Sequence, residues 1–193
     1  MNKRFCIKSI LIFLIIMIFF SLEAYCWGKK RDIINAPSLA VIPFENKIGD
    51  KAYDKKIIYI SNLMIESLYK TKVFRLIEME KLGEILGDES ISKEKLLDNK
   101  KAYIEAIKMI GVDLMLFGTL SKVRRIEKKR SRVLEFYLEG RAVRLISGEI
   151  ICIQSAKGSI KVGKNEVFTQ NDYDLALEKA VKKLATRIAR KCG

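Results

Sequence analysis

The residues with the most evident chemistry are bases gathered around a single acid, Glu127. Guanidinium and ammonium groups bind carboxylates, phosphates and other anions through charge-assisted hydrogen bonds. Residues 120–140 carry the sequence "LSKVRRIEKKRSRVLEFYLEG", in which the basic side chains fall between two runs that alternate like β-strands. The candidates for contact with an anionic surface are Arg124, Arg125, Lys128, Lys129, Arg130 and Arg132, with Tyr137 as a neighbouring anchor.

Three interpretations of this cationic stretch remain open. The first is a solvated turn whose charges keep a long hairpin soluble and prevent edge-to-edge pairing. The second is docking onto anionic lipid headgroups or an acidic partner, worth about 1 kcal/mol for each base near such a surface. Nucleic acid is the third, but the stretch has no interleaved aromatic side chains for stacking and no recognised nucleic-acid motif. We therefore expect no nucleic-acid partner.

The residues that commonly form catalytic sites are either absent or not at the spacing that such sites require. The chain contains no histidine, which removes the commonest general base and the usual serine and cysteine triads. Glycine-rich phosphate loops are absent, and Glu78 and Glu80 flank Met79 as ordinary surface carboxylates do. We expect a protein without enzymatic activity and without a cofactor.

Four cysteines need separate interpretations. Cys6 precedes an apolar run, and Cys26 follows that run at the place of a lipid-modified cysteine, although the preceding residues match a lipobox poorly. Ordinary cleavage after Ala24 or after Cys26 is the alternative. Cys152 and Cys192 are candidates for a disulfide in an oxidising compartment. No CxxC or Cys/His pattern is present, so we expect no zinc site.

The N-terminal residues 1–26 are typical of a secretory signal. Lys3, Arg4 and Lys8 precede the apolar residues 10–20, and "SLEAYCW" follows as a cleavage region. The apolar run is short for a membrane span, which needs about 20 residues, so a short uncleaved anchor is the less favoured alternative. Removing the signal takes three bases and one acid from a chain of net charge +14, so most of the basic charge belongs to the mature domain.

The rest of the chain predicts one α+β domain over residues 38–193, joined to the signal by a linker over 27–37. A hydrophobic fraction of 49% with 31% charged residues favours a folded body. Hydrophobic spacing predicts the following elements in order. They are a strand 38–44, a helix 53–69, a strand 73–78, a helical turn 80–86, a helix from 103 to 110 ended by Gly111, strands 113–125, 132–146 and 149–162, and a helix 172–191.

The last three strands predict an antiparallel meander with one buried and one exposed face. In the middle strand Leu134, Phe136, Leu138 and Ala142 alternate with Glu135, Tyr137, Glu139 and Arg141. Ser147 and Gly148 predict a tight second turn, and the cationic stretch predicts a longer first turn. The fold class expected is α+β, with a mixed sheet, this C-terminal three-strand meander, and helices packed on one face.

Four segments, taken in order, resemble the curli production assembly/transport component (CsgG/HfaB) family. They are "LAVIPFENKIGD", "VFRLIEMEKLGEILGDE", "IGVDLMLFGTLSKV" and "RAVRLISGEIICIQSAKGSI", and the resemblance spans residues 39–188. The fold it implies is also similar to that of LpoB and the N-terminal domain of TolB. Relatives of this kind are periplasmic or anchored to the outer membrane, and they act by binding and assembly.

The resemblance implies an exported, non-catalytic protein of the periplasm or the periplasmic side of the outer membrane, acting in assembly or secretion through an envelope protein partner. Two alternatives are a subunit of an oligomeric outer-membrane secretion channel and an LpoB-like activator of a peptidoglycan synthase. Pore-forming relatives insert hairpins near this meander. Here the bases at the turn would make insertion unfavourable, by roughly 2–4 kcal/mol for each Lys or Arg at mid-bilayer. We therefore expect the chain to lack the pore-forming hairpins.

Overall fold

The computed structural model describes residues 35–77, 104–105, 107–108 and 110–193. The predicted signal with Cys6 and Cys26, most of the linker, Glu78 and Glu80, and the predicted turn 80–86 lie outside these residues. The described residues form a single compact unit.

A mixed sheet organises this unit, with strand order β3-β1-β4-β5-β6 and a short β2 paired to β4. β1 (Ser38–Val41) lies parallel to β3 (Arg75–Ile77) on one side and to β4 (Leu114–Lys128) on the other. β2 (Glu45–Asn46) extends the parallel pairing along β4. β4, β5 (Ser131–Arg144) and β6 (Ile150–Gly163) form the antiparallel meander. The predicted α+β fold with a mixed sheet and a C-terminal meander is confirmed.

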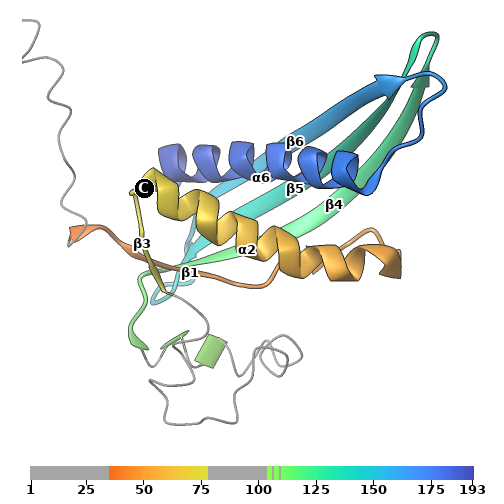
Figure 1. The fold of residues 1–193 in the computed structure, drawn as a ribbon. Coiled ribbons are helices and arrows are strands. Elements are labelled where there is room, and N and C mark those ends of the chain that lie inside the picture. Colours follow the sequence, from red (N-terminus) through yellow and green to blue (C-terminus); the bar gives the residue numbers. More distant parts are fainter. Residues whose placement is uncertain (1–34, 78–103, 106, 109) are drawn as a thin grey trace, which may run out of the picture. The chain divides into compact units, whose positions relative to one another are not determined.

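Two long helices cover one face of this sheet (Figure 1). A short 3-10 helix, η2 (Lys51–Tyr53), leads into α2 (Asp54–Thr71), and α6 (Gln170–Cys192) ends the chain. Thr169 caps α6 because its hydroxyl accepts from the Asp172 N–H while the Asp172 carboxylate accepts from the Thr169 N–H. The buried stripes of both helices follow the 3.6-residue period and face the sheet.

The main core lies between these helices and the meander. Leu134, Phe136 and Leu138 of β5 are fully buried there, as the alternation along the strand predicts. A smaller apolar cluster lies on the opposite face of the sheet, where Ile107 packs with Ala40 of β1, with Ile42 just after that strand, and with Met115 of β4. The sheet is thus covered by α2 and α6 on one face and, near β1, by the segment around Ile107 on the other.

The lengths of the two meander turns are the reverse of the prediction. β4 runs through most of the cationic stretch to Lys128 and pairs with Ser131, so only Lys129 and Arg130 form the first turn. The second connection spans residues 145–149, with Gly148 at a φ of 70°. The prediction was wrong because the cationic stretch has no glycine or asparagine to mark a tight turn. Ser147 and Gly148 do lie in a turn, in which the Gly148 N–H donates to the Arg144 carbonyl oxygen, but this turn is longer than two residues.

The structure explains the glycines and the aspartate of the segment "IGVDLMLFGTLSKV", which leads into β4. Gly111 ends the preceding helical segment at a φ of 71°, as predicted for a helix-terminating glycine. The Asp113 carboxylate accepts hydrogen bonds from the Ser38 N–H at 2.8 Å and the Ser38 hydroxyl at 2.7 Å, which joins the starts of β1 and β4. Gly118 lies against the Phe44 ring, where any Cβ would overlap it.

Candidate functional site

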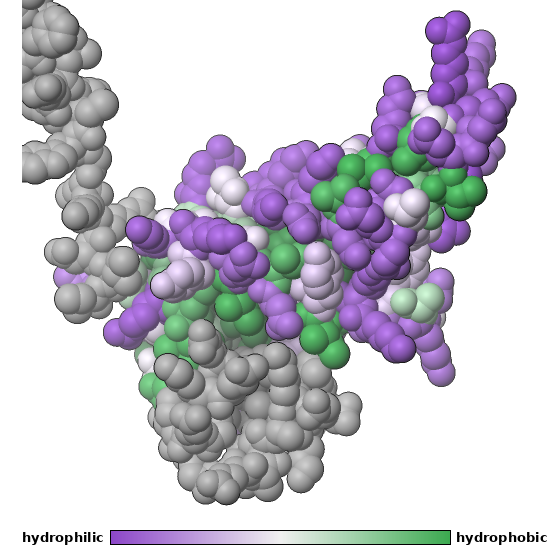
Figure 2. Space-filling model, viewed as in Figure 1, coloured by the Kyte–Doolittle hydropathy of each residue, from purple (hydrophilic) through white to green (hydrophobic). Residues whose placement is uncertain are grey.

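The six candidate bases of the cationic stretch do not form one patch. Strand alternation sends Arg125 and Arg132 to the face covered by α2 and α6, and Arg124 to the open face. Lys128, Lys129 and Arg130 lie at the free end of the β4–β5 hairpin, and we call these three residues the hairpin tip. In Figure 2 hydrophilic residues cover this end of the hairpin.

Arg125 and Arg132 help to attach the hairpin to the rest of the domain. The Arg125 guanidinium lies 5.7 Å from the centre of the Tyr173 ring, and Arg132 lies 5.5 Å from that of Phe168. Arg132 also donates to the carbonyl oxygen of Glu166 at 3.2 Å and lies 3.6 Å from a Glu127 carboxylate oxygen. Cation–π and carbonyl contacts of this kind favour a fixed position for these two bases over contact with an external anion.

Arg124 belongs to a polar cluster on the open face, together with Glu135, Tyr137 and Lys157. The Glu135 carboxylate accepts from the Lys157 ammonium and from the Tyr137 hydroxyl, both at 2.7 Å. Arg124 and Lys157 lie 5.4 and 5.9 Å from the Tyr137 ring centre. Glu135 was predicted to be exposed, but only 7% of it is accessible because these longer side chains cover it.

The protonation of this cluster is set by its hydrogen bonds. The hydrogen bond from Lys157, followed by the one from Tyr137, lowers the pKa of Glu135. The same carboxylate raises the pKa of Lys157 and that of Tyr137. All three directions agree with a charged Glu135–Lys157 pair and a neutral Tyr137 at neutral pH.

Of the six candidate bases, the three at the hairpin tip are available to an external anion. Lys128, Lys129 and Arg130 are exposed. Among the described residues, their side chains form no ion pair, hydrogen bond or ring contact. The two-residue turn holds the three bases close together at the end of two paired strands.

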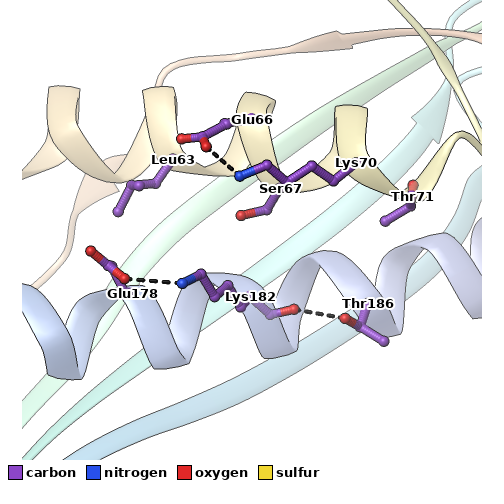
Figure 3. Close-up of a pocket in the computed structure, with 8 residues that line it drawn as sticks. All are labelled: Leu63, Glu66, Ser67, Lys70, Thr71, Glu178, Lys182 and Thr186. Atoms are coloured by element: carbon purple, nitrogen blue, oxygen red, sulfur yellow. Dashed lines mark hydrogen bonds and ion pairs between the residues drawn. The ribbon is translucent and has the colours of Figure 1, made fainter.

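A shallow groove between α2 and α6, of about 330 Å³, was not predicted from the sequence. Figure 3 shows its charged residues paired along each helix, Glu66 with Lys70 at 2.5 Å and Glu178 with Lys182 at 3.0 Å. Leu63, Ser67, Thr71 and Thr186 complete the lining. Because each charge already has a partner one helical turn away, the groove has no net attraction for an ion.

A second groove, of about 450 Å³, is lined by residues of β4, β5 and β6 and extends to α6 at the outer edge of β6; it was also not predicted from the sequence. Its bases come from two elements far apart in the sequence, Lys157 on β6 and Lys183 and Arg187 on α6. Its other lining residues are Ser121, Tyr137, Leu138, Glu139, Ser155 and Ala156. Ser121 sits at a β-bulge in β4, between Leu120 and Lys122, a common feature beside binding sites.

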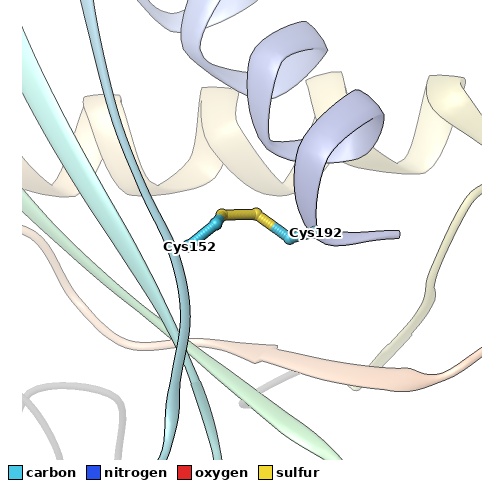
Figure 4. Close-up of a disulfide and its surroundings, with 2 residues drawn as sticks. All are labelled: Cys152 and Cys192. Atoms are coloured by element: carbon cyan, nitrogen blue, oxygen red, sulfur yellow. A yellow bond between two sulfur atoms is a disulfide. The ribbon is translucent and has the colours of Figure 1, made fainter.

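The structure brings Cys152 and Cys192 together as a disulfide (Figure 4). Their Cα atoms are 5.8 Å apart, within the usual range for such a bond. Cys152 lies near the start of β6 and Cys192 at the last residue of α6. The bond therefore attaches the end of the terminal helix to the edge strand.

In the part of the chain that the structure describes, no group of three or more His, Cys, Asp or Glu side chains is placed to hold a metal ion. None of the described helices has the length and apolar character of a membrane span.

No protein-family model matches the chain, and no curated protein matches it in sequence. Several solved structures have a similar backbone fold. Lipoprotein GNA1162 from Neisseria meningitidis is 16% identical in sequence and superposes with a TM-score of 0.47. The match covers 80% of this chain and 99% of that chain. The hypothetical protein CT253 from Chlamydia trachomatis gives 10% identity, coverage of 80% and 92%, and a TM-score of 0.48. The LpoB C-terminal domain from Salmonella enterica gives 18% identity, coverage of 65% and 82%, and a TM-score of 0.37. Similarity at this level does not establish a shared function.

Proposed function

We propose that this chain is a non-catalytic, exported protein of the bacterial cell envelope that acts in assembly or secretion by binding another protein. In this proposal it has the CsgG-like domain without pore-forming hairpins. The signal-like residues 1–26 and the ordered resemblance over residues 39–188 support the compartment and the type of domain.

One structural observation supports the hairpin as a binding arm rather than a membrane insert. Both faces of the outer part of the β4–β5 hairpin carry charge, with Arg124 on the open face and Arg125 and Glu127 on the covered one. A hairpin in a bilayer needs one uniformly apolar face, and each Lys or Arg at mid-bilayer costs roughly 2–4 kcal/mol. The hairpin is therefore suited to an aqueous interface, with its tip available to an anionic surface.

The size and mass of the protein in its native membrane test this proposal. We would extract the chain in mild detergent, measure its molecular size by light scattering, and read the intact mass of the same sample. The expected result is a complex of one or two copies, with a chain cut after Ala24 or Cys26 or lipidated at Cys26.

A large ring that needs detergent would contradict the proposal and favour the secretion-channel alternative. An uncleaved chain of full mass would contradict the expected cleavage and favour the short uncleaved anchor. The variant Lys128→Ala/Lys129→Ala/Arg130→Ala serves as a control for charge-driven aggregation, because it leaves Arg125 and Arg132 in place and should keep the same copy number as the natural chain.

A further inference from the structure

We propose that the outer edge of β6 binds an extended acidic segment of a partner protein as an added strand, with Lys183 and Arg187 as its charge anchors. This inference rests on the proposed protein-binding function and names the chemistry of the partner. The hairpin tip plays no part in it.

The first support is the hydrogen bonding of the strand edge. β6 is the last strand of the sheet, and no described strand pairs with its outer side. Lys183 of α6 donates to the carbonyl oxygen of Lys157 at 3.4 Å, and Arg187 donates to that of Ser155. Alternate residues of an edge strand point their N–H and C=O groups away from the neighbouring strand. The carbonyls of Lys157 and Ser155 therefore point away from β5 at the open edge. They accept hydrogen bonds from the side chains of Lys183 and Arg187, where a neighbouring strand would otherwise donate.

The second support is charge. Lys157 is neutralised by Glu135, whereas no described carboxylate lies within ion-pair distance of Lys183 or Arg187. One helical turn separates the two, and both side chains are exposed beside the groove. Two adjacent cations without acidic partners attract carboxylates, and Arg187 offers a planar donor fork for one.

The third support is the pattern of side chains along the edge. Ile150 and Ile153 near the start of β6 are 49% and 63% exposed, which is high for isoleucine, and the basic part of the groove follows them. An added strand that alternates apolar and acidic residues would place its apolar side chains beside Ile153 on the open face. Its acidic side chains would then lie on the α6 side, beside Lys183 and Arg187.

Binding would exchange one set of hydrogen bonds for another. The backbone N–H groups of the incoming strand replace Lys183 and Arg187 as donors to the carbonyls of Lys157 and Ser155. The released ammonium and guanidinium groups then bind the strand's carboxylates. In the absence of a partner the same two bases protect the edge against unspecific pairing, as edge lysines commonly do.

The test is titration of the purified chain with a fluorescein-labelled octapeptide of alternating valine and glutamate, followed by fluorescence anisotropy. We expect saturable binding that weakens about tenfold or more in the variant Lys183→Ala/Arg187→Ala, because two charge-assisted hydrogen bonds are lost. The matched control Lys55→Ala/Arg75→Ala removes the same charge from α2 and β3 and should change affinity by less than about twofold. Unchanged thermal melting would show that both variants fold.

Hydrogen exchange separates strand addition from simple charge attraction. The amide hydrogens of Ser155 and Lys157 should become protected when the peptide binds. A peptide of the same charge with proline at two of the valines should bind about tenfold less tightly, because proline has no N–H to donate.

Equal or tighter binding by Lys183→Ala/Arg187→Ala would overturn the proposal and leave the two bases as edge protection only. Equal binding of the proline peptide without amide protection would overturn strand addition. Binding of phosphatidylglycerol vesicles through Lys183 and Arg187, with no peptide binding, would assign the groove to a lipid surface. None of these results would change the copy number or mass that tests the proposed function.

Discussion

The two faces of the meander use the same strands in different ways. On the covered face, Leu134, Phe136 and Leu138 are fully buried beneath α2 and α6. On the open face, the intervening residues Glu135 and Tyr137 form a hydrogen-bonded polar cluster with Lys157 and Arg124. Apolar burial, at about 25 cal/mol for each Å² removed from water, stabilises the first face, whereas half-exposed ion pairs add little to the second.

Alternation along a strand assigns each side chain to one face of the sheet, but it does not decide how much of that side chain is exposed to solvent. Glu135 falls on the open face as its position requires, yet its neighbours cover it almost completely. Long basic and aromatic side chains produce a local layer without any helix above it. The free energy of unfolding should accordingly depend strongly on the covered face and weakly on the open one.

The largest expected effect is the loss of the aromatic centre of the covered face. Phe136→Ala should lower the free energy of unfolding by about 4 kcal/mol, since it leaves a cavity between Tyr53 and Tyr173, whose ring centres are 6.1 and 6.0 Å away. Urea denaturation followed by fluorescence would measure this. The open-face control Ser159→Ala should stay within about 0.5 kcal/mol, and comparable losses in both variants would contradict the division of the two faces.

The second-largest loss of stability is expected from a substitution that pushes α6 away from the sheet. A Cβ at Gly158 would overlap the Ala176 carbonyl oxygen and the Ala180 nitrogen, so Gly158→Ala should cost about 3 kcal/mol. The control is Gly163→Ala, because there the nearest group is the movable Glu166 side chain. Thermal melting of both variants would measure the difference, and equal melting temperatures would show that α6 does not pack this closely.

The disulfide should contribute about 2–4 kcal/mol, since Cys152 and Cys192 are 40 residues apart in sequence. The double variant Cys152→Ser/Cys192→Ser should melt at a lower temperature than the oxidised chain. Dithiothreitol should lower the melting temperature of the natural chain to that of the variant and leave the variant unchanged. A natural chain insensitive to the reductant would argue that the two thiols are not bonded.

The open-face cluster should matter less and in a pH-dependent way. Glu135→Gln should cost about 1 kcal/mol at neutral pH, because Lys157 is half exposed and water replaces part of the lost pair. The folded-state pKa of Glu135 is lowered, so its stabilisation is present above the pKa of an unfolded glutamate, about 4.3, and is lost as the pH falls through the lowered value. Urea denaturation at several pH values should show the natural chain and the variant converging in acid; a constant difference would contradict the assigned charge state.

The smallest effect on stability should come from the hairpin tip. Lys128→Ala/Lys129→Ala/Arg130→Ala should change the free energy of unfolding by less than about 0.5 kcal/mol, because these exposed side chains have no partner among the described residues. If the tip docks on anionic lipid, cosedimentation with phosphatidylglycerol vesicles should weaken by about tenfold or more. Replacement of the covered-face base Arg125 by alanine is the comparison variant and should affect stability more than vesicle binding.

The sequence by itself determined the order of β1, α2, β3, the three meander strands and α6, the α+β class, and the buried residues of the covered face, because each depends on the local hydrophobic period. It also identified the cationic stretch and the two cysteines that the structure joins. It did not predict the short elements β2 and η2. The lengths of the meander turns were predicted the wrong way round, since turn residues indicate a turn without specifying where strand pairing ends.

Only the tertiary structure decided which charges meet. It divided the six bases among the covered face, the open face and the tip, and it buried Glu135 beneath Tyr137 and Lys157. It also placed Lys183 and Arg187 of α6 against the edge of β6, about thirty residues away in sequence. A local pattern states which side of its own element a residue occupies, whereas contacts between elements depend on how those elements pack.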